Sequence, residues 1–334
     1  MTPEAVIPAI MGMFDDESDE VRQQAVYSLS RFNDAMAKPL LIRALQDQGH
    51  QVRAAARNCL KERNRHCLAI SCLPELRRLL DQGNSVSQVS AALALGHLGQ
   101  EARDALPSLR RQLEHEDSYV QLGAAISLAR IESDGEGLVE ILSTGLNHPE
   151  DGIREEAIEI LLHLRPSAEA VLPGIIEGLQ NPGNYQRIPR ELLPMVAAMG
   201  HDAEPALPHL LDLLTDSWVG RDVMEVLPRI GPKAIGPLTE LIQNGDPLAQ
   251  QRSVEAIGLM GVEAEKTVPM LIQLLKSGSA GLRIKAAEAL GNIGPGAAEA
   301  VPLLSGVLQD RDIALRIRAK EAIAKIQVES QSSG

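Results

Sequence analysis

Aromatic residues are nearly missing from the chain. Phe, Trp and Tyr make up 2% of its 334 residues, although 44% of the residues are hydrophobic, chiefly Ala, Leu, Val and Ile. A single large globular core needs bulky side chains to fill its middle. A stack of two-helix layers does not, because no point in it lies far from a helix backbone. The composition therefore favours stacked helices over one large globule.

Positive charge is also in deficit. The chain has 32 lysines and arginines against 45 aspartates and glutamates, a formal net charge of −13. Phosphate contacts need a basic surface, so nucleic acid is not an expected partner. One local exception is Arg53, Arg57, Lys61 and Arg65, which recur every four residues and so share one helix face. The acidic background favours a solvated face there, and a local anion or phosphate site is the alternative.

Cysteines and long apolar runs are scarce as well. The three cysteines, Cys59, Cys67 and Cys72, do not suggest a disulfide framework and fit a reducing compartment. No run of about 18 apolar residues is present, and the N-terminus lacks the pattern of a signal peptide. We therefore expect a cytoplasmic protein that does not bind a membrane.

What the chain does have is an internal repeat. The clearest copy, residues 282–294, reads LRIKAAEALGNIG, and similar stretches recur about every 30 residues. The copies begin at Val21, Val52, Ser87, Val120, Ile153, Ile188, Val219, Ala249, Leu282 and Leu315. Upstream of most copies, a proline introduces a second apolar helix, a position where the missing N–H costs nothing. These prolines are Pro8, Pro39, Pro74, Pro107, Pro173, Pro208, Pro237, Pro269 and Pro302.

The spacing of apolar residues predicts how the repeats fold. In the clearest copy Leu282, Ala286, Leu290 and Ile293 form one stripe along a helix. Neither helix of a repeat can bury such a stripe alone, so the repeats must stack. We predict an all-α, right-handed α-solenoid (superhelix) of about ten two-helix repeats over residues 1–328, with a disordered tail at 329–334. Pro194 and the turn-rich stretch before it predict an irregularity near residues 181–195.

The repeat motif resembles HEAT repeats, including the bacterial type also found in phycobilisome lyases. Val21-Arg22, Ile153-Arg154, Leu282-Arg283 and the run Ala289-Leu290-Gly291 carry this resemblance, which extends over nearly the whole chain. It implies a polar ladder between each motif arginine and an aspartate six residues earlier, as in Asp16 and Arg22. It also implies that the second helix of each repeat lines a concave face.

The motif positions that point away from the predicted core are candidates for partner binding. We expect these residues to form a groove for an amphipathic protein segment, unless rotation of the helices buries them in the stack. The candidate partner-binding residues are Tyr27, Asn58, Leu93, His97, Leu122, Ile126, Arg130 and Glu159.

No motif for catalysis is present. The sequence contains no phosphate-binding loop, nucleophile elbow or His-Glu-x-x-His helix, and the spacing of Cys59, His66, Cys67 and Cys72 fits no known zinc pattern. We therefore expect no enzyme activity, cofactor, metal or small-molecule ligand. The prediction is a protein-protein scaffold or adaptor that binds a protein or peptide. Two alternatives remain, a phycobilisome-lyase-like subunit or tetrapyrrole chaperone, and a structural spacer or fragment of a larger protein.

Overall fold

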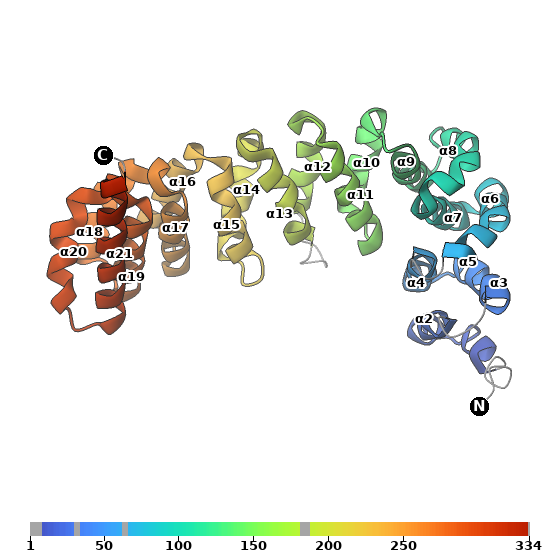
Figure 1. Ribbon diagram of the computed structural model, residues 1–334, viewed down its shortest axis with the longest axis horizontal. Coiled ribbons are helices and arrows are strands. Elements are labelled where there is room, and N and C mark those ends of the chain that lie inside the picture. Colours follow the sequence, from blue (N-terminus) through green and yellow to red (C-terminus); the bar gives the residue numbers. More distant parts are fainter. Residues whose placement is uncertain (1–8, 30–33, 62–65, 181–187, 333–334) are drawn as a thin grey trace. The chain divides into compact units, whose positions relative to one another are not determined.

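The computed structural model describes residues 9–29, 34–61, 66–180 and 188–332, and every regular element in these ranges is a helix. The prediction of an all-α solenoid is confirmed. Contacts divide the chain into two compact units, Met1–Val171 and Leu172–Gly334, each built from paired helices (Figure 1). We call the first helix of each repeat A and the second B. No helix in the described ranges is both long enough and apolar enough to cross a membrane.

Unit 1 contains five B helices. They are α2 (Asp19–Ser28), α4 (His50–Lys61), α7 (Ser85–Leu98), α9 (Ser118–Glu132) and α11 (Asp151–Leu164). Residues 9–13 of unit 1 are also helical. The other helices of unit 1 with described bounds are α3 (Asp34–Ala44), α5 (His66–Ser71), α6 (Leu73–Gln82), α8 (Leu106–Gln112) and α10 (Val139–Thr144), with 3₁₀ helices η3 (Gly99–Ala105), η4 (Glu136–Leu138) and η5 (Gly145–Asn147).

Unit 2 also contains five B helices. They are α13 (Ile188–Met199), α15 (Gly220–Ile230), α17 (Pro247–Leu259), α19 (Ala280–Ile293) and α21 (Ile313–Ser332). The A helices are α12 (Ala168–Gln180), which begins in unit 1, α14 (Leu207–Asp212), α16 (Ile235–Asn244), α18 (Val268–Ser277) and α20 (Val301–Gly306). The 3₁₀ helices are η6 (Gly200–Ala206), η7 (Leu213–Thr215), η8 (Pro232–Ala234), η9 (Gly261–Thr267), η10 (Gly294–Ala300) and η11 (Val307–Gln309).

Two predictions from the sequence concern segments that the structure describes only in part. The turn-rich stretch at 181–187 lies outside them, and α13 begins directly after it and contains Pro194. Helix α21 continues to Ser332, so residues 329–332 are helical where a disordered tail was predicted, and residues 333–334 are not described.

Local signals in the sequence account for the helix boundaries. Asn84, Asp117, Asp246 and Ser279 each accept a backbone N–H at the start of a B helix, which satisfies a donor that has no helical partner. Several A helices have a proline in their first turn, as predicted. These prolines are Pro74, Pro107, Pro208, Pro269 and Pro302.

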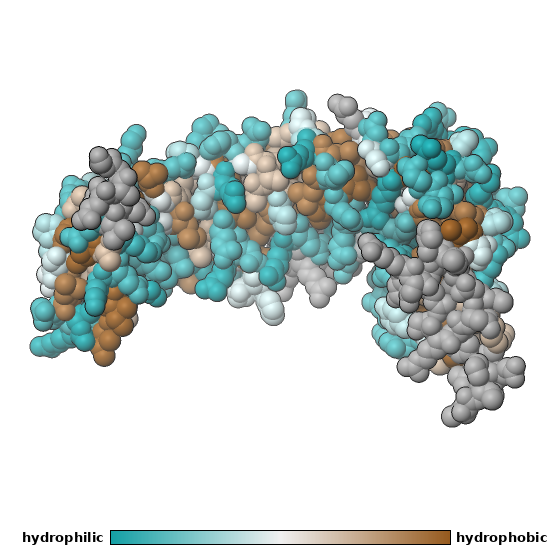
Figure 2. Space-filling view, in the orientation of Figure 1, coloured by the Kyte–Doolittle hydropathy of each residue, from teal (hydrophilic) through white to brown (hydrophobic). Residues whose placement is uncertain are grey.

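The predicted apolar stripe faces the core. Leu282 is 7% exposed, Ala286 and Leu290 are fully buried, and Ile293 is 2% exposed. Small residues bring neighbouring B helices together, because a Cβ on Gly291 would lie 2.7 Å from the Cα of Ala322. Hydrophilic side chains cover most of the visible face of both units (Figure 2).

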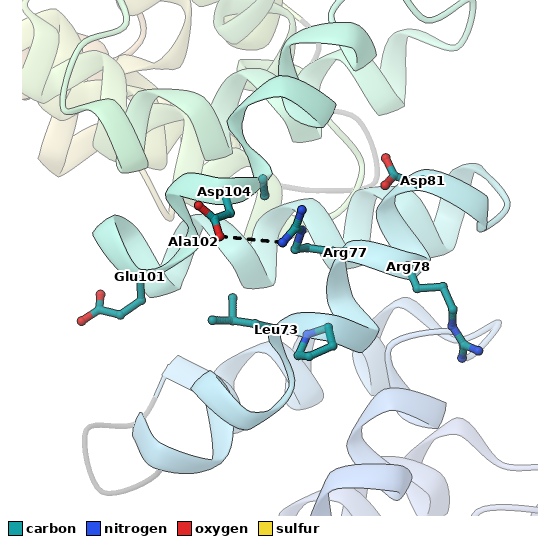
Figure 3. Close-up of a pocket in the computed structure, with 9 residues that line it drawn as sticks. Leu73, Arg77, Arg78, Asp81, Glu101, Ala102 and Asp104 are labelled. Carbon is teal, nitrogen blue, oxygen red and sulfur yellow. Dashed lines mark ion pairs between the residues drawn. The ribbon is translucent and has the colours of Figure 1, made fainter.

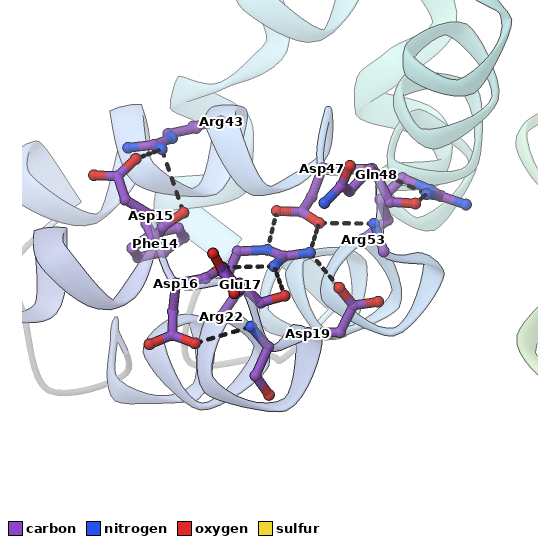
Figure 4. Close-up of polar contacts among 12 residues, drawn as sticks. Phe14, Asp15, Asp16, Glu17, Asp19, Arg22, Arg43, Asp47, Gln48 and Arg53 are labelled. Carbon is purple, nitrogen blue, oxygen red and sulfur yellow. Dashed lines mark hydrogen bonds and ion pairs between the residues drawn. The ribbon is translucent and has the colours of Figure 1, made fainter.

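The polar ladder exists, but the partners differ from those predicted. Arg22 Nη1 donates to the backbone carbonyl of Asp16 at 2.7 Å, whereas Arg22 Nε donates to the carboxylate of Asp47 in the next repeat at 2.9 Å (Figure 4). Arg283 and Asp310 repeat this pattern, with 2.7 Å between Nη2 and Oδ2. Arg22 and Arg283 therefore each join their own repeat to the aspartate of the following repeat.

Repeat 7 lacks the ladder arginine and obtains one from its neighbour. Gly220 occupies the motif position, and Arg252 of α17 donates to the carbonyls of Leu214 and Asp216 beneath it. Leu214 is the residue six positions before Gly220, which is the carbonyl that the repeat's own arginine would reach. A Cβ on Gly220 would overlap the Arg252 guanidinium and the Leu214 carbonyl oxygen. The missing side chain thus makes the room that Arg252 fills.

We predict that Gly220→Ala lowers the free energy of unfolding by roughly 1–3 kcal/mol, because the added methyl displaces Arg252. Gly236→Ala is the control, since a Cβ there meets no atom within 4 Å. It should leave stability unchanged or raise it by up to about 1 kcal/mol. Urea unfolding of the two variants measures the difference, and equal effects would contradict the proposed replacement.

The buried stripe gives a second prediction. Leu290→Asp should lower the unfolding temperature strongly, because it places an unpaired charge in the core. Glu288→Ala, on the solvent side of the same helix, should change the free energy of unfolding by less than about 0.5 kcal/mol. A thermal melt that reversed this order would show that the assigned face of α19 is wrong.

Candidate functional site

The predicted apolar floor of the groove is not at the surface. Leu93 and Ile126 are fully buried and Leu122 is 2% exposed, so the prediction that they line a groove is wrong. Helices α7 and α9 pack along their length and are buried around most of their circumference. Leu122 lies against Gly145, where an added Cβ would be 3.1 Å from its Cδ1. Rotation of the helices into the stack, the alternative considered for the sequence, explains this.

The remaining candidate residues have different surroundings. Tyr27 is 47% exposed, Asn58 is exposed, and the side chain of Glu159 is 68% exposed. The side chain of Arg130 is 15% exposed and that of His97 only 2%. Contact of Tyr27, Asn58, Arg130 and Glu159 with a partner stays a prediction, whereas the His97 side chain is too deeply buried for such contact.

A network of polar side chains, which we call the polar seam, links helices of unit 1. We use this name for Arg53, Arg57, His97, Tyr119, Glu150 and Glu156. Arg53 Nη2 of α4 lies 2.6 Å from Glu150 Oε1 beside α11, and Tyr119 Oη donates to the same oxygen at 3.0 Å. In a regular solenoid each repeat contacts only its neighbours, whereas this contact joins repeats 2 and 5.

The C-terminal half of the seam joins repeats 3 and 5. His97 Nε2 of α7 lies 3.3 Å from Glu156 Oε1 of α11. Arg130 of α9 is 3.9 Å from the other oxygen of Glu156 and 2.7 Å from Glu159. Two of the predicted residues, His97 and Arg130, therefore meet at α11, and Glu159 lies beside them.

Two residues of the basic stripe of repeat 2, Arg53 and Arg57, belong to this seam and not to a solvated face. Arg53 is 4% exposed and Arg57 is 2% exposed, whereas Lys61 is exposed and Arg65 lies outside the described residues. Arg57 Nη1 has no hydrogen-bond partner in the described part of the chain. Burial lowers the pKa of Arg57, although the charges of Glu156 and Glu150 oppose that shift.

Burial and nearby charges also change two other groups of the seam. Burial and the charge of Glu150 raise the pKa of Tyr119 to about 12, so Tyr119 stays protonated and donates to Glu150. Burial alone would raise the pKa of Glu156. The close approach of His97 Nε2, 3.3 Å from Oε1, and the positive charges of Arg130 and Arg57 outweigh it, so the pKa of Glu156 is lowered.

One feature of the sequence could have indicated the seam. Arg22 pairs with Asp47 of the next repeat, but the residue of repeat 3 that matches Asp47 is Gln82, so Arg53 has no acid at the matching position. Arg57 also stands where eight of the nine other repeats have an apolar residue, the exception being Lys320 of the last repeat. The signal identifies an arginine that needs a distant partner, but it does not identify Glu150.

A hollow lies between the C-terminal ends of α9 and α11. Its volume is about 520 Å³, and it contains two of the predicted residues, Arg130 and Glu159. Its other lining residues are Ala129, Ser133, Ile160, Leu162, His163 and Leu164. A second hollow of about 550 Å³ shares Leu164 and extends past Arg165 and Ser167.

The hollow exists because a connecting element is missing. Seven-residue 3₁₀ helices follow α7, α13, α17 and α19, and each packs against the B helix of the next repeat. After α9 only the three-residue η4 is present, and no 3₁₀ helix follows α11. The seven-residue connectors begin with a glycine at positive φ, whereas α9 and α11 end at Ser133 (φ 54°) and Arg165 (φ 49°).

A third hollow, of about 410 Å³, lies between α6 and η3. Arg77 is turned toward Asp104, 3.8 Å away, while Arg78 and Glu101 point to opposite sides (Figure 3). Two of these charges pair with each other and the other two point apart, so they do not form one set of groups that could bind a single ligand. The hollow between α9 and α11 is therefore the stronger candidate site.

The metal set considered for the sequence is only partly visible. Cys59 and Cys72 are buried, and the side chains of His66 and Cys67 lie outside the described residues.

Comparison with known proteins identifies the class of the chain. A model of HEAT repeats matches residues 2–64, 73–162 and 235–324. These segments are well over half of the sequence, so the chain belongs to the HEAT-repeat family, as its motif predicted. The narrower likeness to phycobilisome lyases stays a prediction. No curated protein matches the sequence.

Solved structures of importin beta have a similar fold. Two of them, one from an ammonium sulfate and one from a polyethylene glycol condition, give TM-scores of 0.64 and 0.59 at 14% and 15% sequence identity. Each alignment covers 96% of this chain and 51% of importin beta, so the chain spans about half the length of that protein. At this identity the likeness concerns the fold alone.

The lowered pKa of Glu156 predicts a dependence of stability on pH. A carboxylate with a depressed folded-state pKa stabilises the fold above its ordinary value of 4.5, and this stabilisation disappears as the pH falls through the folded-state pKa. We expect the unfolding temperature of Glu156→Gln to fall less than that of the unmodified chain between pH 7 and pH 3. Glu155→Gln, at an exposed position next to it, should follow the unmodified chain. Parallel curves for all three would contradict the role of Glu156.

Proposed function

We propose that the chain is a non-catalytic scaffold that binds a segment of a partner protein at the open ends of α9 and α11. The observation that carries the proposal is the hollow of about 520 Å³ lined by Arg130, Glu159 and the apolar residues Ile160, Leu162 and Leu164. Protein-binding sites commonly combine an apolar centre with polar side chains at the rim. The seam supports the proposal because it fixes α11 through Glu150 and Glu156, so the hollow is held in shape.

The proposal moves the binding surface from the predicted groove floor to the helix ends. Leu93, Leu122 and Ile126 are removed from it, because they belong to the core. Arg130 and Glu159 are retained, because both line the hollow. His163, exposed beside Glu159, is added to the surface.

Site-specific photo-crosslinking tests the proposal. We expect benzoylphenylalanine at position 163 to crosslink a partner protein in cells that make the chain naturally, because His163 is exposed and lines the hollow. The same amino acid at position 155, exposed on α11 but outside the hollow, is the control. A partner captured equally from both positions, or from neither, would contradict binding at this site.

A further inference from the structure

Two of the four seven-residue connectors, η3 and η6, form a side-chain hydrogen bond to the end of the next B helix. Gln100 of η3 donates through Nε2 to the carbonyl oxygen of Ile131 at the end of α9, at 2.7 Å. In unit 2, His201 of η6 is 2.8 Å through Nδ1 from the carbonyl oxygen of Ile230 at the end of α15, and the ring nitrogen must be the donor. Ile131 and Ile230 both occupy the twelfth motif position.

The same position in α11 is Leu164, and its carbonyl has no such donor. The donor would come from a seven-residue connector after α9, where the chain has only η4. No hydrogen bond to the Leu164 carbonyl oxygen is found among the described residues. Leu164 is a lining residue of both adjoining hollows.

The charges around this vacancy favour a cation. Helix C-termini carry partial negative charge, and the ends of α9 and α11 both border the hollow. Their last carbonyls lack intrahelical donors. Glu159 adds a carboxylate that is 68% exposed, and the chain as a whole carries a charge of −13. Arg130 is shared between two carboxylates, Glu156 and Glu159, which leaves one negative charge in excess among the three. Arg165, which follows Leu164, is exposed and lines the adjoining hollow.

We propose that the partner inserts a lysine or arginine side chain between the ends of α9 and α11. Its N–H donates to the Leu164 carbonyl, the bond that Gln100 and His201 form elsewhere, and its charge lies near Glu159. Apolar neighbours of the basic residue pack on Ile160 and Leu162. This inference rests on the proposed function, and it adds the chemistry of the residue that is bound.

Methyl-detected NMR with peptides tests the chemistry directly. The probes are ten-residue Gly-Ser peptides with a central Leu-X-Leu, in which X is arginine, citrulline, norleucine or glutamate. We expect the arginine peptide to shift the methyl signals of Ile160, Leu162 and Leu164 and to bind roughly tenfold or more tightly than the norleucine peptide. Citrulline keeps the donors and loses the charge, so it should fall between them, and glutamate should bind least.

Two charge-reversed variants locate the cation. Glu159→Lys should weaken the arginine peptide about fivefold or more, because it places a positive charge beside the proposed cation. Glu155→Lys makes the same change outside the hollow and should alter affinity less than twofold. Equal effects of the two variants, arginine and norleucine peptides of equal affinity, or shifts outside the hollow would overturn the proposal.

The proposed function is judged separately. If position 163 crosslinks a partner whose captured segment has no lysine or arginine, the scaffold proposal stands and the basic anchor is wrong. If position 163 captures no partner, the proposed function fails, whatever the peptides do.

Discussion

The structure depends on one constraint, that a B helix can bury its apolar stripe only against neighbouring helices, the A helix of its own repeat and the B helices of adjacent repeats. Leu290 is fully buried for this reason, and Gly291 allows the backbone of α21 to approach α19. Burying each large aliphatic side chain is worth about 1.5–3 kcal/mol, far more than an exposed ion pair. The arginine ladder therefore fixes the register of one repeat on the next, while packing supplies the stability. Gly220 has no side chain to make this contact, and Arg252 of the next repeat donates to the same carbonyl instead.

The polar seam joins repeats that are not adjacent, and this requires the burial of charged side chains. Arg57 is a buried charge with one donor unpaired, and such groups are expensive to remove from water. Arg53, Glu150 and Tyr119 offset part of that cost through short hydrogen bonds between elements nearly 100 residues apart in sequence. A network of this kind fixes one arrangement of repeats 2–5, so its gain lies in specificity of shape more than in free energy.

The sequence predicted features that repeat and missed those that depend on neighbours. The stripe Leu282, Ala286, Leu290 and Ile293 could be read because helical periodicity is local. The burial of Leu93 and Ile126 could not, because it depends on the rotation of α7 against α9 and not on either helix alone. The pairing of Arg53 with Glu150 links distant repeats, and no spacing in the sequence encodes it. Arg130 and Glu159 were identified as partner-binding candidates from motif position, but the hollow beside them follows from a missing connector.

Helices α9 and α11, which lack a seven-residue connector, also end differently from five other B helices. Glycine ends α7, α13, α15, α17 and α19 at positive φ without steric cost, yet Ser133 and Arg165 occupy this conformation after α9 and α11. A non-glycine residue in this region costs about 1 kcal/mol or more, and two occur at adjoining hollows. Selection for stability alone would favour glycine and a covering 3₁₀ helix, as four other B helices have. The two non-glycine residues at positive φ and the hollows therefore occur at the same helix ends, where a carbonyl without a donor from the chain would gain a hydrogen bond from the proposed partner.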